Sequence, residues 1–286
     1  MVVPVSLIPI PLRIAALIQE RNSLLEYPIE RLASVIREIG FQCSSCAKCC
    51  TRAFNGHVFL LDRDVTAVKK IDPAAIEPAP APEFCDQNGI FYVSGYAIRI
   101  QDDNEGSCWF LKDGKCRIYE HRFTICRIYP YMLHREADEK GSVDWRQFCG
   151  LDQHGEYNTT IPDDVCLDIA RETKEYENAF LTQEIRFLEF MRDYFSRHHL
   201  RHVQKVYDDR MRRFNGRRRI ESRFQTGNGH GVRSDATVFF QLQGMQKKAQ
   251  NLEFVIIQSE KSAQPHVIDA SFLRAMHGGQ APGVIL

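Results

Sequence analysis

Hydrophobic and polar positions recur with helical spacing over the first forty residues of the chain. In "RIAALIQERNSLLE" (13–26) apolar residues return every three or four positions, which predicts an amphipathic helix. "PIERLASVIREIG" (28–40) predicts a second helix, because Pro28 suits a first helical turn and Gly40 suits a helix end. The apolar stretch before them, "MVVPVSLIPIPL", is interrupted by three prolines. We interpret it as an extended arm that covers apolar surface of its own core or of a partner.

Shorter runs follow from residue 57 onward. "HVFLL" (57–61) predicts a strand, and "RDVTAVKKI" (63–71) predicts a helix with Asp62 or Asp64 near its start. "DPAAIEPAPAPEF" (72–84) is rich in proline and predicts a weakly structured, exposed loop.

The segment between residues 90 and 116 predicts a small antiparallel β element. "IFYVSGYAIRIQ" indicates either a hairpin or one long strand broken at Gly95. The turn signals "DDNEG" and "KDGK" lie on either side of "SCWFL". We therefore expect Cys108 and Cys116 near the turns of this element.

The pattern changes again after Pro162. Residues 162–214 are expected to be helical for most of their length, with Asp163 as the cap and Asn215 and Gly216 as the stop. Beyond them "IESRF", "ATVFFQLQ" and "LEFVIIQ" predict short strands separated by glycine-rich loops. Helices and short strands in separate stretches favour an α+β fold.

Composition narrows the class of protein. The 286 residues carry a formal net charge of +0 and provide material for one large domain or two small ones. No stretch reaches the roughly 18 apolar residues of a membrane helix, and the N-terminus lacks the features of a secretory signal. Ten cysteines without an export signal indicate metal or redox chemistry in a reducing, cytoplasmic compartment.

The densest cysteine motif is "CSSCAKCC". Cys43, Cys46 and Cys49 form C-x2-C-x2-C, the run in which bacterial ferredoxins place three ligands of a cubane cluster that a remote cysteine completes. Zinc ribbons instead use pairs of C-x2-C steps. Because neighbouring side chains diverge, Cys49 and Cys50 are expected to serve two sites if both are ligands. Alternatively, Cys50 is a buried thiol and only one site exists.

Four more cysteines lie downstream in a related pattern. The stretches "FQCSSCAKCC", "CWFLKDGKCRIYEHR", "CRIYP" and "CG" together resemble the CxxCxxCC, or YkgJ-type, cysteine-cluster family of iron- or zinc-chelating proteins, over roughly residues 40–150. Members usually have proline after the arginine that precedes the seventh cysteine, whereas Phe123 follows Arg122 here.

The resemblance implies a set of eight metal-binding cysteines. They are Cys43, Cys46, Cys49, Cys50, Cys108, Cys116, Cys126 and Cys149. Which remote cysteine joins the first three stays open. Cys85 and Cys166 lie outside the pattern and are expected to be ordinary thiols. Some members of the family carry the label flagellin lysine methylase, but no methyl-donor site is readable in this sequence, so the catalytic residues are unknown.

The tetrapeptide Cys-Arg-Ile-Tyr occurs at Cys116 and again at Cys126. One interpretation is that the repeat serves the thiolates, with basic neighbours that offset charge and apolar neighbours that exclude water. The basic residues are Lys48, Lys115, Arg117 and Arg127, and the apolar ones are Ile118, Tyr119, Ile128 and Tyr129. The repeat can equally be chance, with the tyrosines filling the core.

Two weaker signals lie further along the chain. His198 and His202 are four residues apart on a predicted helix, where we expect a solvated face rather than a zinc site. Residues 197–223 contain ten Lys or Arg and three acidic residues. With the apolar arm, this stretch suggests docking to a protein partner, and no nucleic-acid motif accompanies it.

The leading hypothesis is a cytoplasmic protein with two [4Fe-4S] clusters that transfers electrons or serves as an accessory subunit of a larger redox complex. The first alternative is a zinc-binding module for structure or protein interaction, and the second is an enzyme similar to protein lysine N-methylases. We expect four parts: an arm and helices (1–40), a cysteine-cluster metal-binding domain (41–160), a helical segment (161–215) and a small β-rich extension (216–286).

Overall fold

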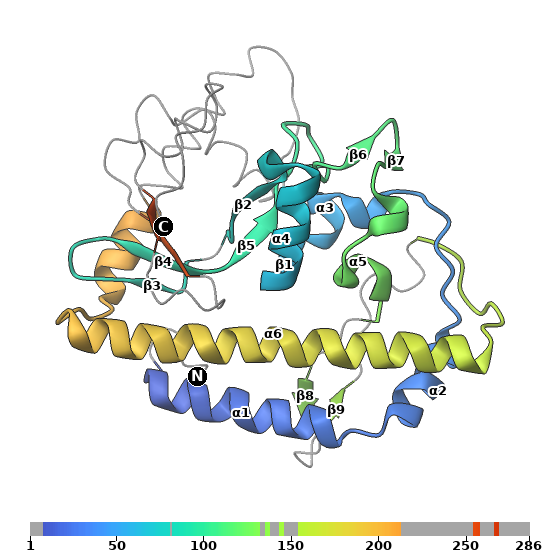
Figure 1. The fold of residues 1–286 in the computed structure, drawn as a ribbon, viewed down its shortest axis with the longest axis horizontal. Coiled ribbons are helices and arrows are strands. Elements are labelled where there is room, and N and C mark those ends of the chain that lie inside the picture. The colour runs from blue at the N-terminus through green and yellow to red at the C-terminus, as the bar shows by residue number, and fades with distance from the viewer. Residues whose placement is uncertain are drawn as a thin grey trace.

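A computed structural model describes residues 8–80, 82–131, 135–137, 143–145, 154–212, 254–257 and 266–268. Helices and small, mainly antiparallel sheets occupy separate parts of it, which confirms the α+β class (Figure 1). The predicted strands "IESRF" and "ATVFFQLQ" and the site residue Cys149 lie outside the described residues. None of the described helices is long and apolar enough to cross a membrane.

The helical layer is built on one long helix, α6 (Asp163–Arg197). Helices α1 (Ile10–Glu26) and α2 (Ile29–Ile39) lie along one side of it, and the two larger sheets and the short helices lie on the other (Figure 1). Pro162 is the N-cap of α6, so the expectation that Asp163 caps this helix was wrong by one residue. The acidic side chain instead lies in the first turn, where it complements the helix dipole.

Both N-terminal helices are confirmed, and α2 ends as expected at Gly40, whose φ is 54°. Helix α1 begins at Ile10, three residues before the expected start. Pro9 is its N-cap and Pro11 falls in its first turn, where a missing N–H group costs nothing. The last residues of the predicted extended arm therefore belong to this helix.

Two small sheets cover the opposite side of α6. The first has the order β1-β5-β2 and the second has the order β11-β10-β4-β3. Their strands are β1 (Phe59–Leu60), β2 (Ile76–Pro78), β3 (Phe84–Cys85), β4 (Phe91–Ser94), β5 (Tyr96–Ile98), β10 (Phe254–Ile257) and β11 (His266–Ile268). Strand β10 confirms the predicted strand "LEFVIIQ" and pairs in parallel with β4.

The remaining elements are short. The paired strands are β6 (Leu111–Lys112) with β7 (Lys115–Cys116) and β8 (Arg135–Ala137) with β9 (Val143–Trp145). The short helices are η2 (Lys48–Cys50), α3 (Arg52–Asn55), α4 (Asp62–Ile71), η3 (Pro73–Ala75), η4 (Tyr119–His121) and α5 (Thr124–Ile128). Residues 204–212 are also helical.

The proline-rich segment 72–84 is more ordered than expected. It contains η3 and β2, and Ala75, Ile76 and Ala79 are buried. Because β2 is the edge strand of its sheet, Pro78 removes no hydrogen bond from a central ladder. The expectation of an exposed loop was wrong because proline composition does not reveal an available sheet edge.

The two alternatives for "IFYVSGYAIRIQ" are now resolved. Strands β4 and β5 belong to different sheets and do not pair, so the segment is one extended run broken at Gly95, whose φ is 66°. The hairpin forms further on, between β6 and β7. Cys108 is followed by the turn at residues 109–110 and Cys116 follows the turn at residues 113–114, so both lie near turns as expected.

The expectation of a helix face with His198 and His202 was wrong, because α6 ends at Arg197. The N–H of Leu200 donates to the carbonyl of Phe195 (2.8 Å) and His199 has a φ of 52°, which is the Schellman ending of a helix. His202 lies beyond this ending and its Nδ1 accepts a hydrogen bond from the N–H of Cys85 (3.0 Å).

Candidate metal centre

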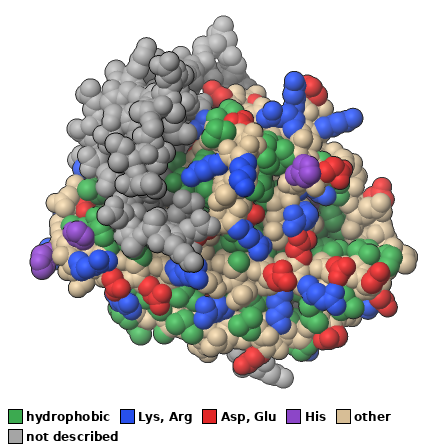
Figure 2. Space-filling model, in the orientation of Figure 1, with side chains coloured by type: hydrophobic (Ala, Val, Ile, Leu, Met, Phe, Trp, Pro, Cys, Tyr) green, Lys and Arg blue, Asp and Glu red, His purple; other side chains and the backbone are tan. Residues whose placement is uncertain are grey.

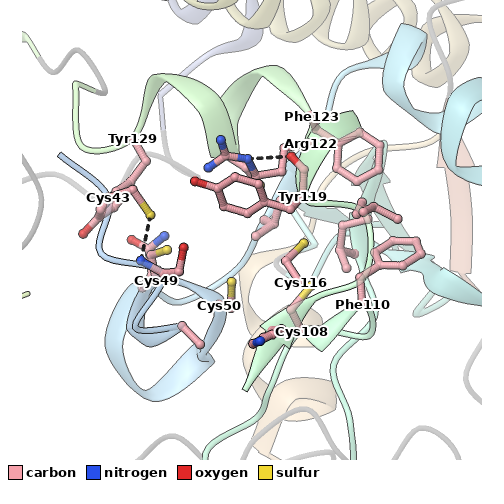
Figure 3. Close-up of a pocket in the computed structure, with 18 of the residues that line it drawn as sticks. Cys43, Cys49, Cys50, Cys108, Phe110, Cys116, Tyr119, Arg122, Phe123 and Tyr129 are labelled. Carbon is pink, nitrogen blue, oxygen red and sulfur yellow. Dashed lines mark hydrogen bonds between the residues drawn. The ribbon is translucent and has the colours of Figure 1, made fainter. Parts of the chain in front are cut away.

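Cysteines from distant parts of the sequence meet where η2, the β6–β7 hairpin and α5 come together (Figure 3). A cavity of about 550 Å³ lies between these elements. Six cysteines line it: Cys43, Cys49, Cys50, Cys108, Cys116 and Cys126. Its apolar wall includes Phe110, Phe123 and Ile125, which also belong to the hydrophobic core, so the cavity is set on a packed floor.

A second cavity of about 140 Å³ adjoins the first. Cys43, Cys49 and Cys126 contribute to the walls of both cavities, and Cys46 lines the smaller one alone. The structure thus brings together all of the predicted metal-binding cysteines that it describes. Cys85 and Cys166 are buried elsewhere and line neither cavity.

The backbone between Cys43 and Cys50 turns twice. Ser45 and Ala47 have φ values of 55° and 61°, in the left-handed region, where the chain reverses its direction within few residues. The N–H of Ser45 points back to the sulfur of Cys43 (3.4 Å), as Figure 3 shows. These turns let cysteines three residues apart face a common space.

The remote cysteines are positioned by backbone pairing. The N–H of Cys108 donates to the carbonyl of Cys50 (2.7 Å), which ties the two cysteine-bearing segments directly together. Cys116 is paired with Leu111 in the hairpin. Cys126 lies in α5, where its N–H donates to the carbonyl of Phe123 (2.9 Å).

Burial and neighbouring thiols raise the pKa of three cysteines in the larger cavity. Burial raises the pKa of Cys108 to about 11, and the charges of Cys116 and Cys49 add to that effect. Burial, followed by the charge of Cys108, also raises the pKa of Cys126. A hydrogen bond with the Cys50 thiol, followed by burial, raises the pKa of Cys49. Without a cation, these three thiols therefore resist ionisation.

Cys46 differs from the others. Burial acts against its thiolate, but hydrogen bonds outweigh burial, and the pKa of Cys46 lies below its usual value. The backbone N–H groups of Lys48 and Gly155 and the Ser44 side chain make these hydrogen bonds. The ammonium group of Lys48 adds a favourable charge, in accord with the expectation for this lysine.

Basic and aromatic side chains close the larger cavity. Arg122 stacks on the ring of Tyr119, 3.8 Å from its centroid, and its Nε donates to the Tyr119 carbonyl (2.9 Å) (Figure 3). The guanidinium charge of Arg122 favours the thiolate of Cys126. Arg127, which we expected to serve the sulfurs, instead forms an ion pair with Glu172 of α6.

The donor set fits a thiophilic metal. None of the nine cysteines that the structure describes forms a disulfide. A cation would relieve the repulsion between thiolates that adds to the raised pKa values of Cys49, Cys108 and Cys126. Thiolates are the ligands of structural zinc and of iron–sulfur clusters. Within the described ranges, however, no three His, Cys, Asp or Glu side chains stand ready around one point to hold a single ion. The sulfurs are spread over the cavity walls and are not arranged as a tetrahedral site for one ion.

The comparison with protein families agrees with this donor set. Residues 42–150 match the model of the CxxCxxCC family, which is described as a "Putative zinc- or iron-chelating domain". The match confirms the resemblance drawn from the cysteine motifs and spans all eight of them. The segment is thus of a class associated with chelation of zinc or iron. No curated protein and no solved structure matches the chain.

The sequence did not predict Arg122 or His154 as residues of the site, although both line these cavities. Arg122 entered only as a departure from the family pattern, and His154 was not considered. His154 follows Cys149 by five residues, but no metal-binding spacing rule covers that interval. Only the tertiary structure reveals His154, because its segment reaches the cavity through the pairing of residue 156 with residue 42.

Proposed function

We propose that residues 42–150 hold two iron–sulfur clusters and that the protein works in electron transfer or as an accessory subunit of a redox complex. The observation that carries the proposal is the cavity of about 550 Å³ with six cysteines on its wall. A single zinc ion needs four ligands with Zn–S distances of about 2.3 Å. Six thiols around a cavity of this volume are more than one zinc ion requires.

The two cavities support a division of the ligands. Cys50, Cys108, Cys116 and Cys126 line the larger cavity, and we assign them to a first centre. Cys43, Cys46 and Cys49 line the smaller cavity and would begin a second centre, in the spacing of bacterial ferredoxins. Cys149 is the remaining member of the eight cysteines that the family resemblance implies, and we assign it as the fourth ligand there. The adjacent Cys49 and Cys50 would then serve different centres.

The surroundings suit a redox centre. A cubane cluster, when bound, exchanges single electrons at a potential tuned by hydrogen bonds, charge and exposure. Phe110 and Phe123 keep water from the floor of the larger cavity, and Arg122 offsets part of the thiolate charge. At the smaller cavity, the N–H groups of Lys48 and Gly155 donate to the sulfur of Cys46.

A protein partner would receive the electrons. The described part of the N-terminal arm leaves Leu12 61 % exposed, which fits an apolar contact. On the face shown in Figure 2, acidic and basic side chains alternate along the lower part of the molecule. The exposed Leu12 and the basic composition of residues 197–223 are the two features from which we place docking at the arm and at this stretch.

The test is the content of iron, zinc and acid-labile sulfide per chain, measured with a visible spectrum on protein purified without oxygen. Roughly eight iron and eight sulfide per chain are expected for two cubane clusters. About two zinc and no sulfide would overturn the proposal and leave the zinc-binding module, whose centres are colourless.

A cysteine variant locates the first centre. Cys126→Ser is expected to lose about half of the iron and sulfide, because one of two four-iron centres would lack a ligand. Cys85→Ala removes a buried thiol that lines neither cavity and serves as the matched control. Equal iron content in the two variants would contradict the assignment of Cys126.

A further inference from the structure

A segment that follows the cysteine motifs, residues 154–159, is paired with the chain just before Cys43. Gln42 and Glu156 form a two-way bridge, with N–H to carbonyl distances of 2.8 and 2.9 Å. The N–H of Asn158 donates to the carbonyl of Ile39 (2.9 Å), and that of Thr159 donates to the carbonyl of Gly40 (3.0 Å). This pairing fixes residue 154 beside the start of the C-x2-C-x2-C run.

The ring of His154 sits among three aromatic side chains at the smaller cavity. Its centroid is 4.7 Å from that of Phe54, 5.3 Å from Tyr129 and 5.9 Å from Phe41. Both ring nitrogens are buried. His154 shares the wall of the cavity of about 140 Å³ with the three cysteines of the run. An imidazole is thus held in a defined position among sulfur donors.

The neighbouring residue is attached to one of those donors. The N–H of Gly155 donates to the sulfur of Cys46. Gly155 has a φ of 75°, and a β-carbon there would overlap the ring of Phe41. Only glycine therefore lets the backbone lie so close to Phe41. His154 directly precedes this glycine, so it is the neighbour of the residue that hydrogen-bonds to Cys46.

We propose that His154 is a metal ligand of the second centre and takes the fourth position beside Cys43, Cys46 and Cys49. The assignment rests on the proposed function and replaces Cys149 at that position. Imidazole nitrogen binds both zinc and iron, so the donor suits either metal. Histidine in place of cysteine raises the potential of an iron–sulfur centre, as in Rieske proteins. The two centres would then differ in potential.

The test uses full-length protein purified without oxygen, with histidine labelled with ¹⁵N in a parallel sample. Pulsed EPR of the reduced wild-type protein is expected to show strong nitrogen coupling that changes with the label. His154→Ala should lose about half of the iron. His154→Cys should keep the iron, lose the coupling and lower the reduction potential of one centre. A histidine that only fills the core would produce none of these spectroscopic changes.

Two further variants provide controls. His57 lines the larger cavity, so His57→Ala removes another cavity histidine and should keep both the iron and the nitrogen coupling. Cys149→Ser should keep full iron if His154 is the fourth ligand. Loss of half of the iron in Cys149→Ser together with full iron in His154→Ala would overturn the assignment.

The failure of the proposed function is distinguishable from the failure of this inference. If the protein contains zinc and no sulfide, the iron–sulfur proposal fails, and X-ray absorption at the zinc edge still tests His154. A nitrogen ligand that is present in wild type and absent in His154→Cys would support His154. All-sulfur coordination in wild-type protein would overturn it.

Discussion

Individual cysteines of this chain experience different surroundings although they belong to one motif set. Burial and neighbouring thiols raise the pKa of Cys108 and Cys126, whereas hydrogen bonds lower the pKa of Cys46. Spacing for Cys46 and the family resemblance for Cys108 and Cys126 predicted all three as donors, but neither contained information about these environments. Burial and hydrogen bonding depend on which other segments pack against each sulfur, and that is decided by the fold.

A buried tyrosine provides a residue-scale test outside the centre. The hydroxyl of Tyr92 donates to Asp86 (3.0 Å), and the same carboxylate accepts from the N–H groups of Asn88 and Ile90 (2.8 and 3.0 Å). Tyr92→Phe should lower the free energy of unfolding by about 1–3 kcal/mol, because a buried carboxylate loses a donor. Urea denaturation measures the change, and a loss below about 0.5 kcal/mol would show that water replaces the hydroxyl.

At the scale of single helices and strands, local sequence patterns predict the helices but not the pairing of the strands. The N-terminal helices follow from apolar periodicity and from Pro28 and Gly40, which act within a few residues of themselves. Strand pairing is different. The pairing of β2 with β5 and the separation of β4 from β5 join or divide segments by contacts that no local pattern encodes.

Gly40 connects helix α2 to the cysteine run, and its replacement tests that junction. A β-carbon at Gly40 would overlap the Thr159 carbonyl, and the φ of 54° is strained for alanine. Gly40→Ala should cost about 2–5 kcal/mol through overpacking and left-handed strain. Gly114→Ala is the matched control, since its φ is 72° and no atom lies within 4 Å of its β-carbon, so strain alone should cost about 1 kcal/mol. Equal costs in urea denaturation would contradict the close approach.

A buried carboxyl group joins α6 to three other segments and predicts a pH dependence. Burial and the charge of Glu83 raise the pKa of Glu184 to about 8, while Ser94 donates to its Oε1 (2.7 Å) and Arg13 lies nearby. Between pH 5 and 8 the folded chain therefore holds more protons at Glu184 than the unfolded chain does. By linkage, this contribution to stability is largest at low pH and is lost as the pH rises towards 8.

Glu184→Gln tests this sign, because glutamine keeps the hydrogen-bonding shape without a titrating proton. The decrease in the free energy of unfolding from pH 5 to pH 8 should be smaller in the variant than in wild type. Urea denaturation at several pH values under identical metal loading measures the difference. Parallel curves for the two proteins would show that Glu184 does not titrate in this range.

At the scale of the whole molecule, hydrophobic packing and the cysteine centre stabilise different regions. Three clusters of buried apolar residues hold α1, α2 and the sheets against α6. Cys108 and Cys126 pack against one of these clusters, whereas the other cavity cysteines lie on segments held by two-residue strands and isolated bridges. Metal ligation would therefore supply much of the order around the cavities.

Removal of the metal tests this division. Anaerobic chelation should lower the Tm on the order of 10 °C, because ligation energy is lost only from the folded state. Far-UV circular dichroism should retain most of its helical signal, since the apolar clusters that hold α1 and α2 against α6 do not involve the centre. Limited proteolysis should then cut between residues 43 and 50. An unchanged Tm would argue against a structural contribution of the metal.

The sequence alone determined the class of the site, through cysteines at ferredoxin-like spacing and a family resemblance, and it also determined the two N-terminal helices and the end of α2 at Gly40. These features act over short distances or through side-chain chemistry, so they can be read without a fold. The tertiary structure decided which cysteines share a cavity and that β2 forms in a proline-rich stretch. It also brought His154 to Cys46 through pairing of residue 156 with residue 42. The bridge between residues 42 and 156 joins segments more than a hundred residues apart, and only the packing of the whole chain selects contacts of this kind.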